Sequence, residues 1–222
     1  MTKYGQFCPI AKAAEVLGER WTLLIVRELL LGSTRFNELQ RALAHMSPSL
    51  LTKRLEELQQ ADLIFKKKAR GQIFATYHLT PEGRQLSPVI EALAAWGMRS
   101  VRAGIDRSDL DAEFLMWDIR RRIDTEQLPS KHCVLGFHFS DQKRFRDWWL
   151  VVDDADVDLC TREPGRDADL HVVAELRTLV DVWMGNLSIS AARNSQKLKL
   201  IGSSAVGRRF NKWFTLSAMA LR

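Results

Sequence analysis

The stretch that decides the fold of the first half of the chain is residues 47–83, SPSLLTKRLEELQQADLIFKKKARGQIFATYHLTPEG. It opens with a serine and a proline, which suit the start of a helix. Serine caps unpaired backbone N–H groups, and proline lacks only an N–H that has no partner there. Leu51, Leu55 and Leu58 then recur at helical spacing and must face inward. A helix with one buried face is therefore predicted at the start of this stretch.

The outward face of this helix is small and polar near its N-terminus. The side chains that it presents are Ser49, Thr52, Lys53, Glu56 and Gln60. A helix that reads DNA needs such a face, because it must enter a major groove about 12 Å wide and reach the base edges. We therefore predict a recognition helix.

A basic hairpin is predicted directly after the recognition helix. Two short strands flank a turn at Arg70-Gly71. The cations of this hairpin are Lys66, Lys67, Lys68 and Arg70. As a wing beside a helix-turn-helix, the hairpin would lie along the phosphate backbone, where charge supplies affinity but carries no sequence information directly. The alternative is a solvated hairpin whose lysines protect a sheet edge. The order of helix-turn-helix and basic hairpin favours the wing.

Three further helices are expected before the recognition helix, at residues 9–17, 19–31 and 35–43. We expect Gly18 to end the first of these in a left-handed cap. The second helix has apolar residues around most of its circumference and should be the buried central helix. Ser33 or Thr34 is expected to cap the third.

A long helix is predicted after the hairpin, over residues 81–102, with Thr80 as its cap. Its apolar stripe consists of Leu86, Ile90, Leu93, Gly97 and Val101. This is more apolar surface than one small domain has to cover. We therefore expect a homodimer through helix 81–102, with packing on the chain's own core as the alternative. A palindromic DNA site contains two half-sites, and a dimer supplies one recognition helix for each of them.

The net charge divides the chain into two parts. Of the 222 residues, those in 1–103 carry 15 Lys/Arg and 9 Asp/Glu, and those in 104–222 carry 18 of each, so the whole +6 lies in the first part. We predict two domains, 1–103 and 104–222, of which only the first meets a polyanion. The fold class is α+β: a winged helix-turn-helix domain followed by a second α+β domain.

Alternating apolar residues predict a sheet in the second part. We expect strands at 132–139, 149–152, 157–162, 170–176 and 198–202, and helices at 110–123, 177–184, 188–194 and 203–214. The run Arg120-Arg121-Arg122 is predicted to be a solvated helix end, where positive charge suits the helix dipole. The acidic turn at 153–156 lacks the glycine and distal glutamate of a calcium loop.

Residues 7–100 resemble the HxlR-type winged helix-turn-helix transcriptional regulators, relatives of the MarR-like group. The motifs that carry the resemblance are Cys8-Pro9-Ile10, Leu17-Gly18-Glu19-Arg20-Trp21, Arg35-Phe36-Asn37-Glu38-Leu39, Leu50-Leu51-Thr52-Lys53-Arg54-Leu55 with Glu57-Leu58, Tyr77-His78-Leu79-Thr80-Pro81-Glu82-Gly83 and Trp96-Gly97. Asp62 departs from the family, which usually has glycine there, but aspartate tolerates a left-handed conformation. Some members sense oxidants through a cysteine near the N-terminus, and Cys8 matches that position. The resemblance thus makes Cys8 a redox candidate, and a structural thiol is the alternative.

The second part resembles the sterol carrier protein fold, an antiparallel sheet with helices around an apolar tunnel. The specific stretch is residues 170–202, with the segments Trp183-Met184-Gly185-Asn186-Leu187, Ala191-Ala192 and Lys197-Leu198-Lys199-Leu200-Ile201-Gly202. The resemblance implies a cavity for a small hydrophobic ligand, and a solid aromatic core is the alternative. The candidate pocket residues are Phe137, Phe139, Trp148, Trp183 and Met184.

These observations predict a DNA-binding transcriptional regulator that acts in the cytoplasm. The candidate DNA-contact residues are Arg35, Ser47, Ser49, Thr52, Lys53, Arg54, Lys66, Lys67, Lys68 and Arg70. The partners expected are double-stranded DNA, a second copy of the chain and a small hydrophobic ligand, with no membrane. No nucleophile–base pair, phosphate loop or metal-ligand spacing stands out, so we expect no enzyme activity, cofactor or metal. The alternative is a lipid-binding protein whose winged helix docks on proteins, which would not need four cations on the hairpin.

Overall fold

The computed structural model describes residues 3–68, 74–100 and 106–217. The chain divides into two compact units, Met1–Gly97 and Met98–Arg222. Within the described residues, no helix combines the length and the apolar character needed to cross a membrane.

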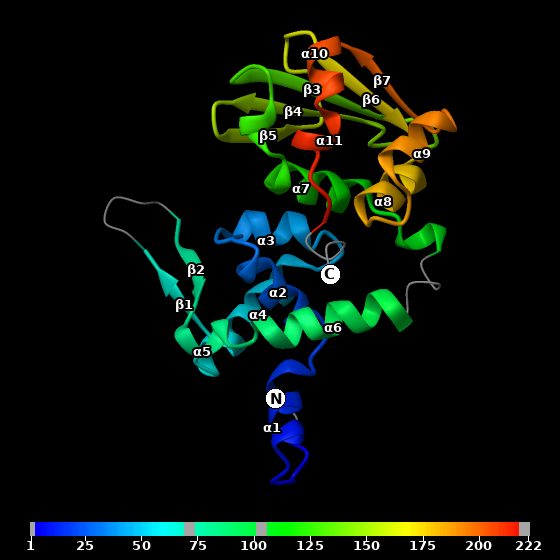
Figure 1. Cartoon of the computed structure of the whole chain (residues 1–222). Helices are drawn as coiled ribbons and strands as arrows, with labels where there is room; N and C mark the ends of the chain where they lie inside the picture. The colour runs from blue at the N-terminus through cyan, green and yellow to red at the C-terminus, as the bar shows by residue number, and fades with distance from the viewer. Residues whose placement is uncertain (1–2, 69–73, 101–105, 218–222) are drawn as a thin grey trace. The chain divides into compact units, whose positions relative to one another are not determined.

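The first unit has the helix order of a winged helix-turn-helix (Figure 1). Its elements are α1 (Pro9–Leu17), α2 (Thr22–Leu30), α3 (Phe36–Ala42), α4 (Pro48–Gln60), β1 (Ile64–Lys67), β2 (Thr76–Leu79), α5 (Pro81–Arg84) and α6 (Ser87–Ser100). β1 and β2 pair antiparallel, from Ile64 opposite Leu79 to Lys67 opposite Thr76. The core lies where α2, α3 and α4 meet, and Ile25, Leu39 and Leu51 are completely buried there.

The turn after α4 confirms the reasoning about Asp62, whose φ is +57°. The left-handed cap expected at Gly18 is wrong, because its φ is −73°. Glycine is needed there for space instead: a Cβ at this position would lie 2.5 Å from the carbonyl oxygen of Ala14. The left-handed residue of this turn is Trp21, with a φ of +80°.

The cap of α3 also differs from the prediction. Glu38 reaches back, and its Oε2 accepts hydrogen bonds from the backbone N–H groups of Thr34 at 2.8 Å and Arg35 at 2.9 Å. The hydroxyl of Ser33 donates instead to the buried carboxylate of Glu28 at 3.3 Å. An acidic side chain in the first turn thus replaces the hydroxyl cap.

The single helix predicted over 81–102 is two helices, α5 and α6. Thr80 does cap α5, accepting from the N–H of Gly83 at 3.0 Å. Pro88 in the first turn of α6 has no N–H to continue the hydrogen-bond ladder from α5, which explains the break. Val101 and Arg102 at the end of the predicted helix lie outside the described residues.

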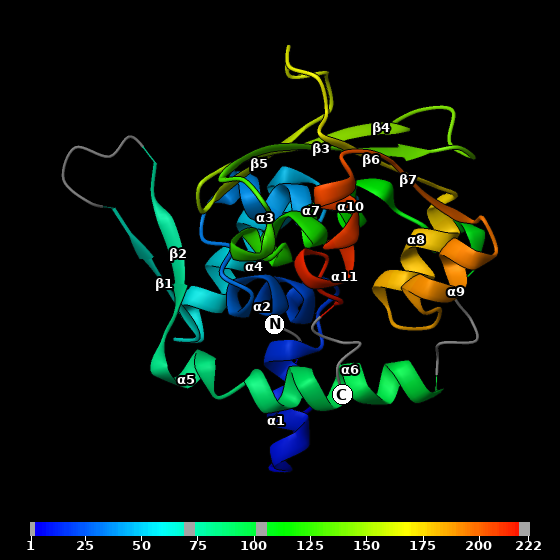
Figure 2. The same cartoon turned by 45° about the horizontal axis from the view of Figure 1, so that its top comes forward.

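The second unit is a five-stranded sheet with helices. Its elements are η2 (Arg107–Asp109), α7 (Ala112–Arg122), η3 (Thr125–Gln127), β3 (His132–Phe139), β4 (Asp147–Asp153), β5 (Asp156–Cys160), β6 (Leu170–Ala174), α8 (Leu176–Trp183), α9 (Ile189–Asn194), β7 (Leu198–Gly202), α10 (Ser204–Arg208) and α11 (Phe210–Trp213). The strand order is β5-β4-β3-β6-β7. The central pair β3–β6 is parallel and every other pair is antiparallel. Helices α7, α8 and α11 lie on one side of the sheet in both views (Figures 1 and 2).

Alternation along the strands separates the two faces of this sheet. Leu135, Phe137 and Leu150 point to the helical side and belong to one core cluster with residues of α7, α8 and α11. The helix predicted over 203–214 is interrupted at Arg209, giving α10 and α11. Phe210 of α11 packs on Trp213 and Phe214 with ring centroids 4.8 Å away in each case, so aromatic side chains fill this side of the core.

Candidate nucleic-acid interface

The start of α4 places short hydroxyl side chains at an exposed helix end. Ser47 caps the helix, accepting from the N–H of Leu50 at 3.3 Å, and its hydroxyl lies 3.2 Å from that of Ser49. The Thr52 hydroxyl donates to the carbonyl oxygen of Pro48 at 3.0 Å. Its hydrogen is therefore engaged, and Thr52 offers an outside partner its oxygen lone pairs and its methyl group. All of these hydroxyl groups are exposed.

Lys53 and Arg54 are adjacent in sequence but have opposite environments. The Lys53 side chain is 66% exposed, and its ammonium lies 4.0 Å from Glu57. Arg54 is buried, and its guanidinium bonds the carboxylate of Glu19 at 2.6 Å, the carboxylate of Glu57 and the carbonyl oxygen of Arg20 at 3.2 Å. Its donors are engaged in holding α4 to the preceding turn, which argues against the predicted contact of Arg54 with DNA.

The hairpin carries its cations on the surface. Lys66, Lys67 and Lys68 are all exposed. The ammonium of Lys66 lies 5.6 Å from the ring centroid of Tyr77, its cross-strand partner. This cation–π contact orients one lysine while leaving its charge in water. Arg70, the fourth predicted cation, lies outside the described residues.

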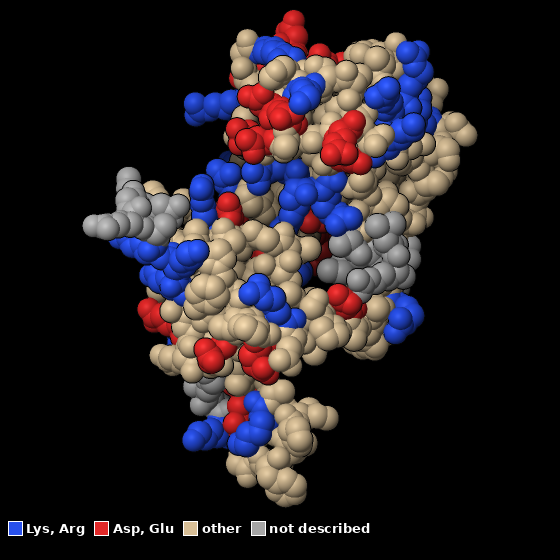
Figure 3. Space-filling view, turned by 60° about the vertical axis from the view of Figure 1, so that its left-hand side comes forward, with Lys and Arg blue, Asp and Glu red and all other residues tan. Residues whose placement is uncertain are grey.

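Arg35 connects the hairpin to the helix-turn-helix. It pairs with Thr76 in an isolated antiparallel bridge, and the N–H of Tyr77 donates to the carbonyl oxygen of Thr34 at 2.8 Å. The exposed Arg35 side chain thus starts beside the first residue of β2, at the end of the strand pair nearest the turn. Figure 3 shows blue side chains gathered at the hairpin end of the first unit. These contacts fix the start of β2 against the start of α3, and no sequence pattern predicted them.

The three cysteines are free and differ in burial. Cys8 is half-buried at the N-cap of α1. Burial, reinforced by the nearby carboxylate of Asp169, raises the pKa of the Cys133 thiol to about 12. Such a thiol is not reactive at neutral pH. No group of three or more metal-ligating side chains occurs among the residues that the structure describes.

The five predicted pocket residues of the second unit belong to its core cluster or pack against it. Phe139 and Trp183 are buried in the core, and Met184 packs against it. Trp183 is held there by an edge contact with the Phe214 ring at 5.2 Å. Of these five residues, Phe137 and Trp148 also border a cavity of about 320 Å³ that opens on the other side of the sheet. Sequence reasoning missed it because strand alternation identifies the inward residues and says nothing of what lies on the outer face.

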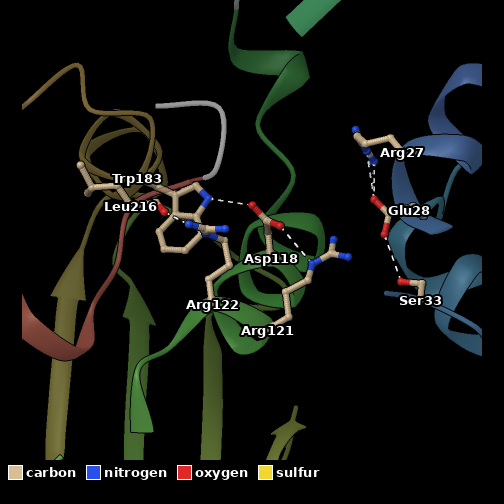
Figure 4. A network of polar contacts seen from close by, with 8 residues as sticks. All are labelled: Arg27, Glu28, Ser33, Asp118, Arg121, Arg122, Trp183 and Leu216. Atoms are coloured by element: carbon tan, nitrogen blue, oxygen red, sulfur yellow. Dashed lines mark hydrogen bonds and ion pairs between the residues drawn. The ribbon is translucent and has the colours of Figure 1, made fainter. Parts of the chain in front are cut away.

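Sequence reasoning also missed two polar networks (Figure 4). In the second unit, Asp118 of α7 accepts from the Trp183 indole at 3.0 Å and from Arg121 at 3.1 Å. Arg120 donates to the carbonyl oxygen of Val157 at 2.6 Å, and Arg122 donates to that of Leu216 at 2.8 Å. The predicted solvated arginine run is therefore wrong: Arg120 and Arg122 fasten α7 to other segments, and Arg121 bonds within the helix.

In the first unit, the buried carboxylate of Glu28 is held by Arg27 at 2.7 Å and by Ser33 (Figure 4). Burial of a carboxylate requires such partners. This network stabilises the turn between α2 and α3.

The helix order, the capped polar start of α4 and the exposed cations of the hairpin define a winged helix-turn-helix DNA-binding regulator. The family model described as HxlR-like helix-turn-helix matches residues 16–104. The uncharacterized HTH-type transcriptional regulator YvaP of Bacillus subtilis is 36% identical over 113 residues, which are 97% of its length and 48% of this chain. The chain therefore belongs to the HxlR-like helix-turn-helix family.

Other relatives match the same part of the chain. The HTH-type transcriptional regulator YodB of Bacillus subtilis is 32% identical over 91 residues, covering 81% of its length and 40% of this chain. The solved structure of YodB in its reduced form is similar to this chain at 29% identity with a TM-score of 0.39, covering 45% of this chain and 100% of YodB.

Proposed function

We propose that this protein is a homodimeric transcriptional regulator that binds double-stranded DNA with α4 in the major groove and the hairpin along the phosphate backbone. The observation that carries the proposal is the exposed polar face of α4 next to a hairpin with three exposed lysines. A helix and a basic wing in this order match the geometry that helix-turn-helix proteins use.

The side chains divide by the chemistry that each can supply. Ser49, Thr52 and Lys53 project from the exposed start of α4 and suit contacts with base edges. Arg35 and the three hairpin lysines suit phosphate oxygens, as does Ser47 at the helix N-terminus. Arg70 stays in this group on the strength of the sequence alone.

The dimer contact is proposed on α6, extended by α1. Val89, Leu93 and Trp96 of α6 are 49%, 46% and 54% exposed. Within the described structure no residue of α1 is buried, and its apolar Ile10 is 79% exposed. Exposed apolar residues in such numbers favour an interface. A Cβ at Gly97 would have no heavy atom within 4 Å, so this position has room for a close partner.

The second unit is proposed to be a sterol-carrier-like domain that senses a small hydrophobic ligand. A mixed five-stranded sheet with helices α7, α8 and α11 on one face supports the fold. The lipid-binding alternative, with a winged helix that docks on proteins, is less favoured because such a module has no use for the lysines of the hairpin.

The proposal is tested by selecting duplexes that the purified protein retains from a random-sequence pool. A dimer with one recognition helix per copy should enrich an inverted repeat with half-site centres about 10 base pairs, or a multiple of this, apart. Binding of an enriched duplex should fall steeply with salt, because phosphate contacts release counterions. Failure to enrich any sequence above the starting pool would argue against a sequence-specific regulator.

A further inference from the structure

The face of the sheet opposite the helices carries a row of unusual side chains. Strand register places Trp149 of β4, Gly136 of β3, His171 of β6 and Ile201 of β7 side by side across four strands. All four border the cavity of about 320 Å³. Gly136 is the one member of this row without a side chain.

Gly136 is required by the position of His171. A Cβ at residue 136 would lie 2.6 Å from Nδ1 of His171 and 3.0 Å from its Cε1. The imidazole therefore leans over the glycine. A glycine in the middle of a central strand weakens the strand, so a close neighbour or a ligand is the usual reason to find one there.

A second row supplies a polar group to the same cavity. His138 of β3 stands opposite Asp147 of β4, and Nδ1 of the histidine lies 2.6 Å from the Asp147 carboxylate. Burial raises the pKa of Asp147, but hydrogen bonds from His138 and Arg146 outweigh this and hold that pKa below its ordinary value, so the carboxylate is ionised at neutral pH. An ionised carboxylate only accepts, so Nδ1 of His138 donates to it, and in the uncharged form of the imidazole Nε2 is a hydrogen-bond acceptor.

We propose that this cavity binds a flat aromatic molecule that carries a hydroxyl group, a phenol in the chemical sense. The ring would stack against the Trp149 indole beside the His171 imidazole, and the hydroxyl would donate to Nε2 of His138. A volume near 320 Å³ is at the lower end of the range for small-molecule sites, roughly 300–1,000 Å³, and suits one or two fused rings.

The charge of the site distinguishes a phenol from an aromatic carboxylate. Asp147 borders the cavity and is ionised, so an anionic ligand would meet a like charge. A neutral hydroxyl avoids this repulsion and supplies the donor that the histidine acceptor needs. The inference deepens the proposed ligand-sensing role and rests on it for the regulatory consequence. Binding to the cavity itself can be measured in the absence of DNA.

The test is titration of 2-naphthol into the intact protein by calorimetry at mildly alkaline pH, with 2-methoxynaphthalene and 2-naphthoate as matched probes. Loss of the donor should weaken binding about tenfold, because an acceptor lining the cavity is left without a partner. We expect 2-naphthol to bind at least about tenfold more tightly than either matched probe. Equal affinities for 2-naphthol and 2-methoxynaphthalene in the unmodified protein would overturn the proposal, without reliance on any variant.

The chain offers a control pair for the histidine. His132 and Asp153 face each other on the same two strands, with Nδ1 of His132 2.8 Å from the carboxylate, but they do not border this cavity. H138L should abolish the preference for 2-naphthol, and H132L should leave it intact. An equal effect of both variants, or none of either, would count against the site. Affinity for DNA should be unchanged in ligand-free H138L, so a failure of this site and a failure of the DNA-binding proposal give different results.

Discussion

Substitutions of Arg54 and Lys53 give the most direct test of which face of α4 stabilises the fold and which face contacts DNA. In Arg54→Met the aliphatic stem is kept and the guanidinium is removed, which leaves Glu19 and Glu57 without their shared partner. Breaking a buried ion pair costs about 3–5 kcal/mol. The two glutamate side chains are 37% and 21% exposed, so water recovers part of this loss. We expect a net destabilisation of about 2–3 kcal/mol.

The matched control is the same substitution one residue earlier. The Lys53 side chain is 66% exposed, so Lys53→Met should change stability by no more than about 0.5 kcal/mol. Thermal unfolding followed by circular dichroism at one fixed protein concentration separates the two. Arg54→Met should lower the Tm by about 5–10 °C, at roughly 2–4 °C per kcal/mol for a chain of this size.

The effects of the two substitutions on DNA binding should be the reverse of their effects on stability. Well below its Tm, Arg54→Met should keep its preference for a selected duplex over a scrambled one, whereas Lys53→Met should lose part of it. An Arg54→Met protein with an unchanged Tm and no discrimination between the duplexes would refute the assignment of Arg54 to the fold.

Individual residues support three further predictions. Replacing Lys66, Lys67 and Lys68 with alanine should weaken binding to selected and random DNA by similar factors and reduce the salt slope by about 0.9 for each phosphate that is no longer neutralised; a weakening confined to the selected duplex would contradict the wing. Gly83→Ala should destabilise the first unit by about 1–3 kcal/mol in urea unfolding, because its Cβ would lie 2.0 Å from the backbone oxygen of Leu63, whereas Gly97→Ala, with open space around it, should not destabilise the isolated protomer. The Cys133 pKa of about 12 is above its ordinary 9.0, so the contribution of this thiol to stability is complete below pH 9.0 and is lost as the pH rises toward 12; Cys133→Ala should flatten that alkaline limb, and iodoacetamide should leave Cys133 unmodified in the native protein.

The winged helix could be predicted from sequence because its signals are local. Ser47 and Thr80 cap the helices that they were expected to cap, and Asp62 adopts the predicted left-handed conformation. Each of these depends on a few neighbouring residues, which a linear pattern contains.

The features that could not be predicted depend on partners distant in sequence. From the sequence, Arg54 is expected to be an exposed cation of α4. In the fold it pairs with Glu19, which lies 35 residues earlier in the chain. Two arginines of α7 bond Val157 and Leu216, which lie 37 and 94 residues away from Arg120 and Arg122. The cavity on the sheet forms only because register brings Trp149, Gly136 and His171 into one row.

The central claim is that the exposed start of α4 reads DNA sequence. The most direct measurement is the affinity of the double variant Thr52→Ala/Lys53→Ala for a selected duplex and for a scrambled duplex, compared with the unmodified protein at the same salt concentration. Each good base contact is worth about 1–3 kcal/mol of discrimination, so the variant should lose about tenfold or more of its preference while it still binds random DNA through the hairpin. An unchanged preference in the folded variant would show that α4 is not the reader.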